Sequence, residues 1–322
     1  MKLTRKLIGL SLLILLIFVM VACSFIGRND SDFPETGFDD RNKGKIVVGG
    51  KDFTEQYLLT KITSIYLKEN GYDVEEVDGM KSRVARSALK QGHIDLYWEY
   101  TGTALTVYMN QPPEPDPEKA YMFVKERDRK NGLVWLHKTE FNNTYTILMR
   151  KDQAREMGIQ TISELSDFII ESVGHTFKFA TNAEFYRRSD GLKGLEKKYG
   201  FHFSKESLIK MNTDLLYDAL KERQVDASVG FATDGRIRGY NLVSLKDDQS
   251  YFPAYNAAPV VRKETLQKYK NLNSLLNDIA DRLDTKTITR LNYEVDIQHK
   301  SVTKVAREWL RSQGLVSAKH PE

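Results

Sequence analysis

The sequence has very little cysteine, because Cys23 is the only one among 322 residues. A disulfide needs two cysteines, so no cross-link can form within one chain. Zinc sites built from several cysteines are excluded for the same reason. The six histidines show none of the short spacings, such as H-x-x-x-H, that metal sites use. We therefore expect no bound metal.

Motifs of catalysis and cofactor binding are missing as well. The chain contains no G-x-S-x-G turn, no Walker loop and no dinucleotide-binding glycine fingerprint. We therefore expect neither enzymatic activity nor a cofactor. An exported hydrolase is the enzyme alternative, and these absences disfavour it.

Charge of one sign is not in large excess. The formal net charge is +4, and residues 1–22 contribute Lys2, Arg5 and Lys6 but no acidic residue, so the charge falls to +1 without them. A nucleic-acid partner needs a concentrated basic face, because phosphate contacts provide most of the affinity. We expect no such partner.

The one long hydrophobic run lies at the N-terminus. It extends from Leu7 to Val21, after the three basic residues, and is shorter than the ~20 residues of a membrane-spanning helix. A small residue, Ala22, precedes Cys23. We predict a lipoprotein signal peptide over 1–22, lipidation of Cys23, and a flexible tether over 23–43. The mature protein would be lipid-anchored at the extracytoplasmic face of the cell membrane.

Beyond the tether, short strand patterns alternate with helical patterns. A buried strand is predicted over Lys45–Gly50, and Asp52 to Glu55 has the pattern of a capping box that opens a helix. A second capping box is predicted over Thr161 to Glu164. This alternation predicts an α/β fold with mainly parallel sheets, whose ligands bind beyond the carboxyl ends of the strands.

An internal echo indicates two similar halves. The residues Ala-Leu-Lys at 88–90 are followed by Ile-Asp at 94–95, and Ala-Leu-Lys at 219–221 is followed by Val-Asp at 225–226, at identical spacing. Five residues beyond each aspartate stand Tyr100 and Phe231, and a Thr/Gly-containing loop follows each. Equal spacing into two such loops favours a two-lobed molecule.

Three of the sixteen tyrosines, Tyr100, Tyr145 and Tyr240, stand where a strand or helix pattern meets a polar loop. This placement suggests an aromatic box for a quaternary ammonium group, which has no N–H to donate and is held by dispersion and by the aromatic quadrupole. The alternative is that these tyrosines are ordinary half-buried packing residues.

Several segments together resemble the substrate-binding proteins of ABC importers for glycine betaine, choline and related quaternary amines. They are residues 45–56, 94–103, 142–145, 184–191 and 231–237. The resemblance covers about Gly44 to Leu315. It implies a two-lobed, type II periplasmic-binding-protein fold with the ligand in a cleft between lobes that close on it. We place the crossings near Asn143 and Ser250, so that 44–143 plus 250–318 form lobe I and 144–249 form lobe II.

The resemblance also implies a binding site. An aromatic cage around the cationic head would comprise Tyr100, Tyr145, Tyr217 and Tyr240, with Phe231 where many relatives have tyrosine. From spacing alone, however, Tyr217 belongs to the packed face of its helix.

The opposite end of the ligand would meet Lys51, Thr103 and Arg188, which match positions that contact a carboxylate in betaine-binding members. Two cations without counter-charges would favour a betaine over choline. From the residues alone, Arg188 could equally pair with Asp190. The acidic Glu99 next to the predicted cage has the pattern of a solvated side chain.

These observations predict a monomeric solute-binding lipoprotein that delivers a quaternary ammonium compound, such as the osmoprotectant glycine betaine, to an ABC permease. Two alternatives remain at this point. The chain could be a ligand-sensing domain on the same fold, since fold does not fix function. Its ligand could instead be choline, or a larger betaine such as ergothioneine, because all share the cationic head.

Overall fold

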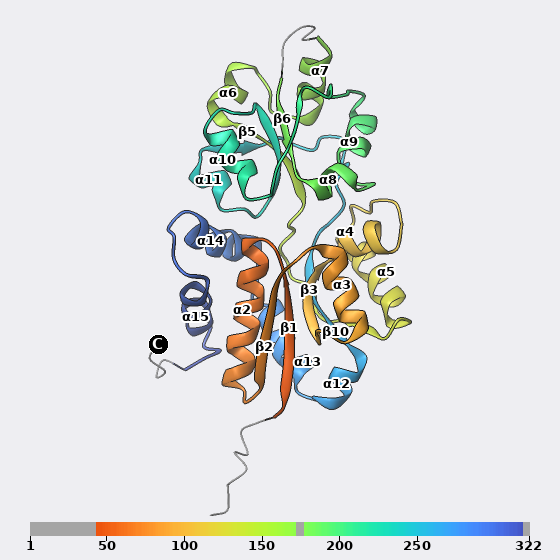
Figure 1. The fold of residues 1–322 in the computed structure, drawn as a ribbon, viewed down its shortest axis with the longest axis vertical. Coiled ribbons are helices and arrows are strands. Elements are labelled where there is room, and N and C mark those ends of the chain that lie inside the picture. Colours follow the sequence, from red (N-terminus) through yellow and green to blue (C-terminus); the bar gives the residue numbers. More distant parts are fainter. Residues whose placement is uncertain (1–42, 172–176, 318–322) are drawn as a thin grey trace, which may run out of the picture. The chain divides into compact units, whose positions relative to one another are not determined.

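The computed structural model describes residues 43–171 and 177–317, which contain two five-stranded sheets with helices packed on them (Figure 1). The predicted α/β class is confirmed, but the expectation of mainly parallel sheets is wrong, because each sheet is mixed and includes one strand that runs antiparallel to both of its neighbours. The signal peptide, Cys23 and nearly all of the tether lie outside the described residues.

The first sheet has the strand order β2-β1-β3-β10-β4. Its strands are β1 (Lys45–Lys51), β2 (Asp73–Met80), β3 (Leu96–Tyr100), β4 (Leu133–Trp135) and β10 (Ala257–Arg262). β1 pairs in parallel with β2 and β3, whereas β10 runs antiparallel to β3 and β4. β10 follows all the strands of the second sheet in the sequence, so the first sheet is completed by a strand that comes after them.

The second sheet has the order β7-β6-β8-β5-β9. Its strands are β5 (Tyr145–Arg150), β6 (Phe179–Thr181), β7 (Leu208–Lys210), β8 (Ala227–Phe231) and β9 (Leu242–Ser244). β6 is parallel to β7 and β8, and β5 is antiparallel to β8 and β9. The strands of this sheet all come from the segment between β4 and β10.

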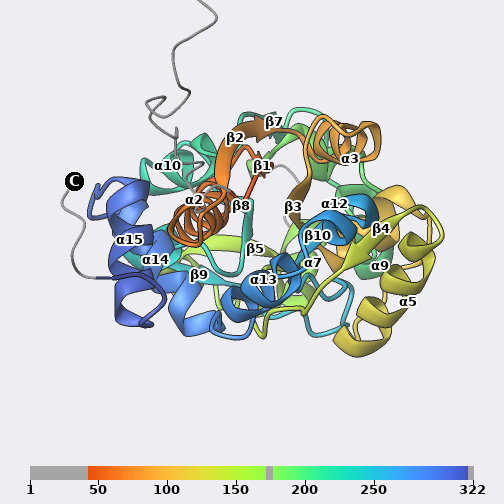
Figure 2. The same ribbon diagram turned by 90° about the horizontal axis from the view of Figure 1, so that it is seen from below.

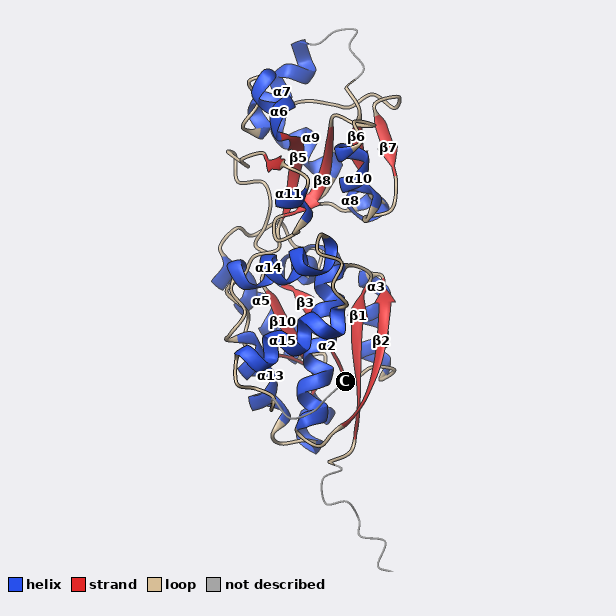
Figure 3. Ribbon diagram, turned by 90° about the vertical axis from the view of Figure 1, so that its left-hand side faces the viewer, coloured by secondary structure: helices blue, strands red, loops and turns tan. Residues whose placement is uncertain are grey.

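Helices flank β1 on both sides (Figure 2). α2 (Thr54–Glu69) packs against α14 (Thr285–Asp296) and α15 (Val302–Ser312), which lie together in Figure 3. α3 (Ser82–Gln91) takes the other side, where its Ala85 and Leu89 join a separate apolar cluster. The remaining helical elements are α4 (Thr101–Thr103), the π-helical η1 (Ala104–Tyr108), α5 (Pro117–Arg129), α6 (Lys151–Glu156), α7 (Ile162–Glu171), α8 (Ala183–Arg187), α9 (Leu192–Tyr199), α10 (Leu215–Lys221), α11 (Arg236–Gly239), α12 (Lys263–Lys268) and α13 (Leu272–Ala280).

The echo in the sequence corresponds to a repeated arrangement. α3 leads to β3 and α10 leads to β8, and each of these strands pairs antiparallel with a strand that enters its sheet from the other half of the chain. The register places Tyr100 opposite Ala257 and Phe231 opposite Tyr145. Two residues that the sequence separates by 86 positions are therefore neighbours at one strand end.

One of the two predicted capping boxes is wrong. α2 begins at Thr54 with Phe53 as its N-cap, and no side chain caps it, because Asp52 forms an ion pair with Lys81 instead. The second is confirmed: the Glu164 amide donates to the Thr161 hydroxyl at 3.1 Å, and the Thr161 amide donates to the Glu164 carboxylate at 2.8 Å.

Candidate ligand-binding site

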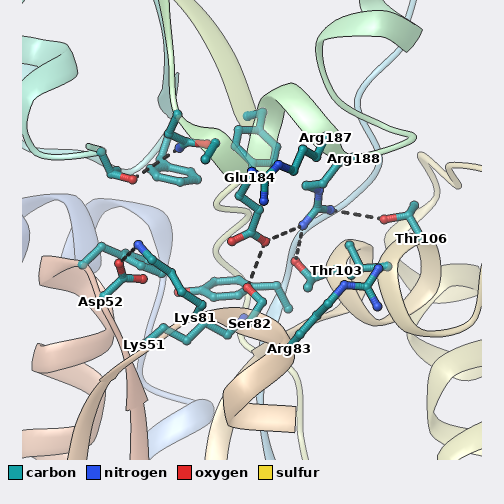
Figure 4. Close-up of a pocket in the computed structure, with 18 of the residues that line it drawn as sticks. Lys51, Asp52, Lys81, Ser82, Arg83, Thr103, Thr106, Glu184, Arg187 and Arg188 are labelled. Carbon is teal, nitrogen blue, oxygen red and sulfur yellow. Dashed lines mark hydrogen bonds and ion pairs between the residues drawn. The ribbon is translucent and has the colours of Figure 1, made fainter. Parts of the chain in front are cut away.

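A pocket of ≈ 610 Å³ is lined by residues at or near strand ends of both sheets (Figure 4). That volume lies within the range of about 300 to 1,000 Å³ that small-molecule sites occupy. The predicted site residues that line it are Lys51, Tyr100, Thr103, Tyr145, Arg188 and Phe231. Six predicted residues from distant parts of the sequence therefore meet at one cavity.

Four aromatic rings form a continuous row along the pocket. Phe53 lies 6.1 Å from Tyr100 and stacks on Phe231 at 5.4 Å with a 16° interplanar angle, and Phe231 lies 5.1 Å from Tyr145, all between ring centroids. Tyr145 and Phe231 meet because they are opposite each other in the β5–β8 ladder. The row is an extended apolar and π surface contributed by both sheets.

Two predicted cage members lie elsewhere. Tyr217 does not line the pocket: it is fully buried on α10, and its hydroxyl accepts a hydrogen bond from the Phe231 backbone amide at 3.0 Å. The Arg236 guanidinium lies 4.3 Å from its ring centroid. Tyr217 therefore lies where its helical spacing predicted, on the packed face of its helix. It contributes to the site by holding the backbone of Phe231.

Tyr240 also lies outside the pocket lining. It follows the short helix α11, and the Lys221 ammonium lies 4.9 Å from its ring centroid. Partial burial, together with Asp218, raises the pKa of the Tyr240 phenol. Phe53 takes its place in the aromatic row, because the chain turns into α2 at that residue and directs the ring toward Phe231.

Lys51 is not a free cation. Its side chain is 3% exposed and forms an ion pair with the completely buried Glu99, whose other carboxylate oxygen accepts hydrogen bonds from Tyr97 and Tyr108, each at 2.7 Å. The Lys51 ammonium also lies 5.0 Å from the Tyr100 ring centroid. The expectation of a solvated Glu99 is wrong, and the charge of Lys51 is already neutralised within the first half of the chain.

Arg188 is likewise paired. Its guanidinium donates two hydrogen bonds to Asp190, at 2.8 and 2.6 Å, and a third to the Thr103 hydroxyl at 3.3 Å. The alternative that Arg188 pairs with Asp190 is thus confirmed. Although burial opposes its ionisation, Arg188 holds the pKa of Asp190 below the usual value. An uncompensated pair of cations at Lys51 and Arg188 is therefore absent, and the argument for betaine over choline that rested on it is wrong.

Arg188 also joins the two halves of the site. It donates to Glu184 at 3.2 Å and to the Tyr255 hydroxyl at 2.8 Å, and Glu184 in turn accepts from the Ser82 hydroxyl at 2.9 Å. These bonds link α8 to α3 and to the segment before β10. These hydrogen bonds make one part of the pocket wall a connected polar network, whereas the aromatic row forms an apolar part of the wall.

Beneath the row, the carboxylate of Glu55 is 2% exposed and accepts four hydrogen bonds. The donors are the hydroxyls of Tyr100 at 2.7 Å and Thr233 at 2.5 Å, and the amides of Asn143 at 2.8 Å and Asn292 at 3.2 Å. Burial raises the pKa of Glu55. This carboxylate ties the start of α2 to Asn143 in the segment between β4 and β5, to the loop after β8 and to α14.

Sequence reasoning missed several pocket residues, among them Phe53, Ser82, Glu184, Arg83 and Arg187. Phe53 lies inside the predicted capping box, so the pattern assigns its segment to the start of a helix and not to a binding site. The available signal is its position between the end of the predicted strand and the start of the helix. The others lie on α3 and α8, and no pattern in the sequence relates those helices to each other.

Comparisons with known proteins agree with this geometry. Residues 44–312 match the family model described as the substrate-binding domain of ABC-type glycine betaine transport systems. A glycine-betaine-binding protein of Pseudomonas aeruginosa is 44% identical over 273 residues, which are 84% of this chain and 88% of that protein.

Two further relatives extend the comparison. The ergothioneine transport permease/ergothioneine-binding protein EgtU of Helicobacter pylori is 34% identical over 274 residues, covering 84% of this chain and 48% of that longer protein. The crystal structure of a glycine betaine/carnitine/choline ABC transporter protein is 27% identical with a TM-score of 0.69, covering 84% of this chain and 98% of that one. The predicted type II periplasmic-binding-protein fold is confirmed. This chain belongs to the family of substrate-binding domains of ABC-type glycine betaine transport systems.

Proposed function

We propose that the pocket binds a small quaternary ammonium zwitterion of the betaine type for delivery to an ABC permease. The observation that carries the proposal is the row of Tyr100, Phe53, Phe231 and Tyr145 along one pocket. A trimethylammonium group offers no hydrogen-bond donor, so apolar contact and the negative faces of aromatic rings are its main attractions. The similarity to the glycine-betaine-binding protein of P. aeruginosa supports this ligand class.

The two phenylalanines are the principal contacts in this proposal. Each tyrosine already faces an internal cation, since Lys51 lies 5.0 Å from the Tyr100 ring centroid and Arg188 lies 5.4 Å from that of Tyr145. Phe53 and Phe231 have no such neighbour among the described residues. Their half-buried faces are therefore the ones available to a bound cation. Lys51, Thr103 and Arg188 then act mainly by holding Tyr100 and Tyr145 in place.

Titration calorimetry with glycine betaine, proline betaine, carnitine, choline and ergothioneine tests the proposal. Phe53→Ala and Phe231→Ala should each weaken binding of the preferred ligand by ~1 to 2 kcal/mol, about five- to thirtyfold. Tyr240→Ala is the matched control, because this aromatic residue lies outside the pocket lining. Unchanged affinity in both phenylalanine variants, with the fold intact, would remove the aromatic row from the binding site.

A larger betaine is the second candidate ligand. The similarity to the H. pylori ergothioneine protein favours it, as does the ≈ 610 Å³ cavity, which exceeds the volume of glycine betaine severalfold. The same calorimetric panel separates the two ligands. A role without catalysis further requires that each compound be recovered unchanged after incubation.

Membrane anchoring through Cys23 remains part of the proposal. Within residues 43–171 and 177–317, no helix has both the length and the apolar composition to cross a bilayer. Cys23→Ala should release the protein from the membrane fraction or stall processing, whereas the wild type should partition with membranes and carry lipid. Wild-type protein recovered unmodified in the medium would contradict the anchor.

We also propose the domain division 44–143 plus 250–318 and 144–249, with a monomer as the functional unit. The strand content supports it, because β5 to β9 all belong to one sheet and the other strands to the second. The hydrogen bonds that Ser82 donates to Glu184 and Arg188 donates to Thr103 would then join the two lobes across the pocket. Small-angle scattering with and without ligand measures whether the radius of gyration falls on binding, as closure requires.

A further inference from the structure

A second, much smaller cavity lies behind the aromatic row. Its volume is ≈ 10 Å³, and Phe53, Thr213 and Phe231 line both this cavity and the ligand pocket. The two phenylalanine rings therefore separate the cavities. A space of this size holds about one water molecule, so a betaine cannot enter it.

The described residues that line the small cavity include three carboxylates and one cation. The carboxylates belong to Glu55, Asp234 and Asp296, and the cation is Arg236. The Arg236 guanidinium donates hydrogen bonds to both oxygens of Asp234, at 3.0 and 2.8 Å, and so neutralises that residue. The remaining acidic groups behind the rings are Glu55 and Asp296.

Asp296 on α14 is buried next to the start of α2. Its side chain is 10% exposed, and its Oδ1 atom accepts a hydrogen bond at 2.6 Å from Thr54, the residue that follows Phe53. Its Oδ2 atom has no hydrogen-bond partner among the described residues and lies 3.7 Å from Nε of Arg236. Burial raises the pKa of Asp296 to about 6, although Arg236 opposes the shift. The charge of this carboxylate therefore changes close to neutral pH.

The groups that face Asp296 come from several elements. They are Glu55 on α2, Asp234 in the loop after β8, Arg236 on α11, Asp214 before α10, and the phenol of Tyr240. Lys300 and Arg238 also lie near α14, but the former pairs with Glu294 and the latter lies over the Tyr293 ring. Asp234 and Asp214 oppose the ionisation of Asp296, whereas Arg236 favours it. A ligand cation beyond the ring of Phe53 would favour it further.

We infer that the carboxylate of Asp296 attracts the cationic head of the ligand from behind the rings of Phe53 and Phe231, without touching it, so that binding releases protons and weakens as the pH falls. This inference rests on the proposed function. A bound cation favours the ionised carboxylate, so the ligand lowers the pKa of Asp296. Protonation below about pH 6 neutralises the carboxylate and removes the attraction.

Coulomb's law gives the size of the effect. A cation in front of a ring and a carboxylate behind it are about 10 Å apart, and an effective dielectric constant of about 40 to 80 then corresponds to about a two- to fourfold change in affinity. Because linkage is reciprocal, the ligand should raise the acid dissociation constant of Asp296 by the same factor. Low ionic strength suits the measurement, since the Debye length is about 30 Å at 0.01 M.

Titration calorimetry with glycine betaine at about pH 5, 6 and 7.5 tests the inference, because the ligand's own charges do not change in this range. The wild type should bind about two- to fourfold more tightly at pH 7.5 than at pH 5. At pH 6 the binding enthalpy should depend on the ionisation enthalpy of the buffer, because protons are released. Asp296→Asn should bind with the lower affinity at all three pH values and lose the buffer dependence. Asp167→Asn is the control, since this exposed carboxylate on α7 lines neither cavity, and it should behave like the wild type.

Carbon-detected NMR of the Asp296 carboxyl in the wild type gives a second measurement that needs no variant. Its titration midpoint should fall when glycine betaine saturates the protein. An unchanged midpoint, equal wild-type affinity at pH 5 and 7.5, or an Asp296→Asn variant that keeps the wild-type pH dependence would each overturn the inference and leave the proposed function intact. If glycine betaine does not bind, the tightest-binding compound of the calorimetric panel takes its place. A wild type that binds no compound of the panel at any pH refutes the proposed function, and the inference with it.

Discussion

The buried carboxylate of Glu55 provides the sharpest test of how this molecule is held together. It accepts four hydrogen bonds from residues that lie 45 to 237 positions away in the sequence. Glu55→Ala removes the acceptor common to all of them. The donors of Tyr100, Asn143, Thr233 and Asn292 would then face a small cavity.

The magnitude follows from opposing contributions. Hydrogen bonds to a charged group contribute about 1.5 to 3 kcal/mol each, whereas removing a buried carboxylate also relieves a desolvation penalty of several kcal/mol. Burial raises the pKa of Glu55, and the four hydrogen bonds act in the opposite direction. We expect a net loss of about 2 to 4 kcal/mol in the free energy of unfolding.

Glu55→Gln should cost less than half as much. A glutamine keeps one acceptor oxygen and presents an amide N–H on the other side. The Oδ1 atom of Asn143 has no hydrogen-bond partner among the described residues, so an amide flip of Asn143 would let it accept from the new N–H. The difference between the two variants therefore separates hydrogen bonding from charge.

Thermal unfolding and urea denaturation measure the effect. For a domain of this size, 1 kcal/mol corresponds to roughly 2 to 4 °C, so Glu55→Ala should lower the midpoint by about 4 to 16 °C. Glu206→Gln, at an exposed position, is the control. An alanine variant that melts within about 1 °C of the wild type would refute the reasoning, because four buried donors would then have lost their acceptor without consequence.

Three further predictions concern single residues. Tyr217→Phe should lower the free energy of unfolding by about 1 to 3 kcal/mol, measured in urea, because the Phe231 amide loses the hydroxyl that accepts its hydrogen bond. An equally stable variant would contradict that role. Lys51→Ala should destabilise the protein more than Lys81→Ala, because it leaves the completely buried Glu99 without its counter-ion, whereas Lys81→Ala frees the partly exposed Asp52. The melting temperatures of the two variants test this order. Burial raises the pKa of Asp296 from 3.8 to about 6, so its contribution to stability is fully present below about pH 4 and is lost as the pH rises from 4 to 6. Asp296→Asn should therefore flatten the stability profile between about pH 4 and 6 relative to the wild type.

Much of this protein could be predicted from its sequence because the information was local. The alternation of strand and helix patterns determined the α/β class, and the Thr161 to Glu164 capping box formed as predicted because both partners lie within one turn. Equal spacing of Tyr100 and Phe231 after two similar helix-to-strand joins indicated the repeated halves. The motifs that carry the family resemblance predicted a shared site for Tyr100, Thr103, Tyr145, Arg188 and Phe231, and all five line one pocket.

Tertiary structure alone decided which charges and which rings are available to a ligand. Lys51 and Arg188 are neutralised by Glu99 and Asp190, and whether a cation has a partner depends on distances that no spacing along the chain specifies. The same holds for the ring of Phe53, which stacks on Phe231 across 178 residues of sequence. Arg83 and Arg187 meet at one cavity because α3 and α8 are packed on different sheets that share a pocket. The spacing of hydrophobic residues determines each helix or strand locally, because the two have different periods. The role of a side chain at a strand end depends instead on which residues of the two sheets pack beside it.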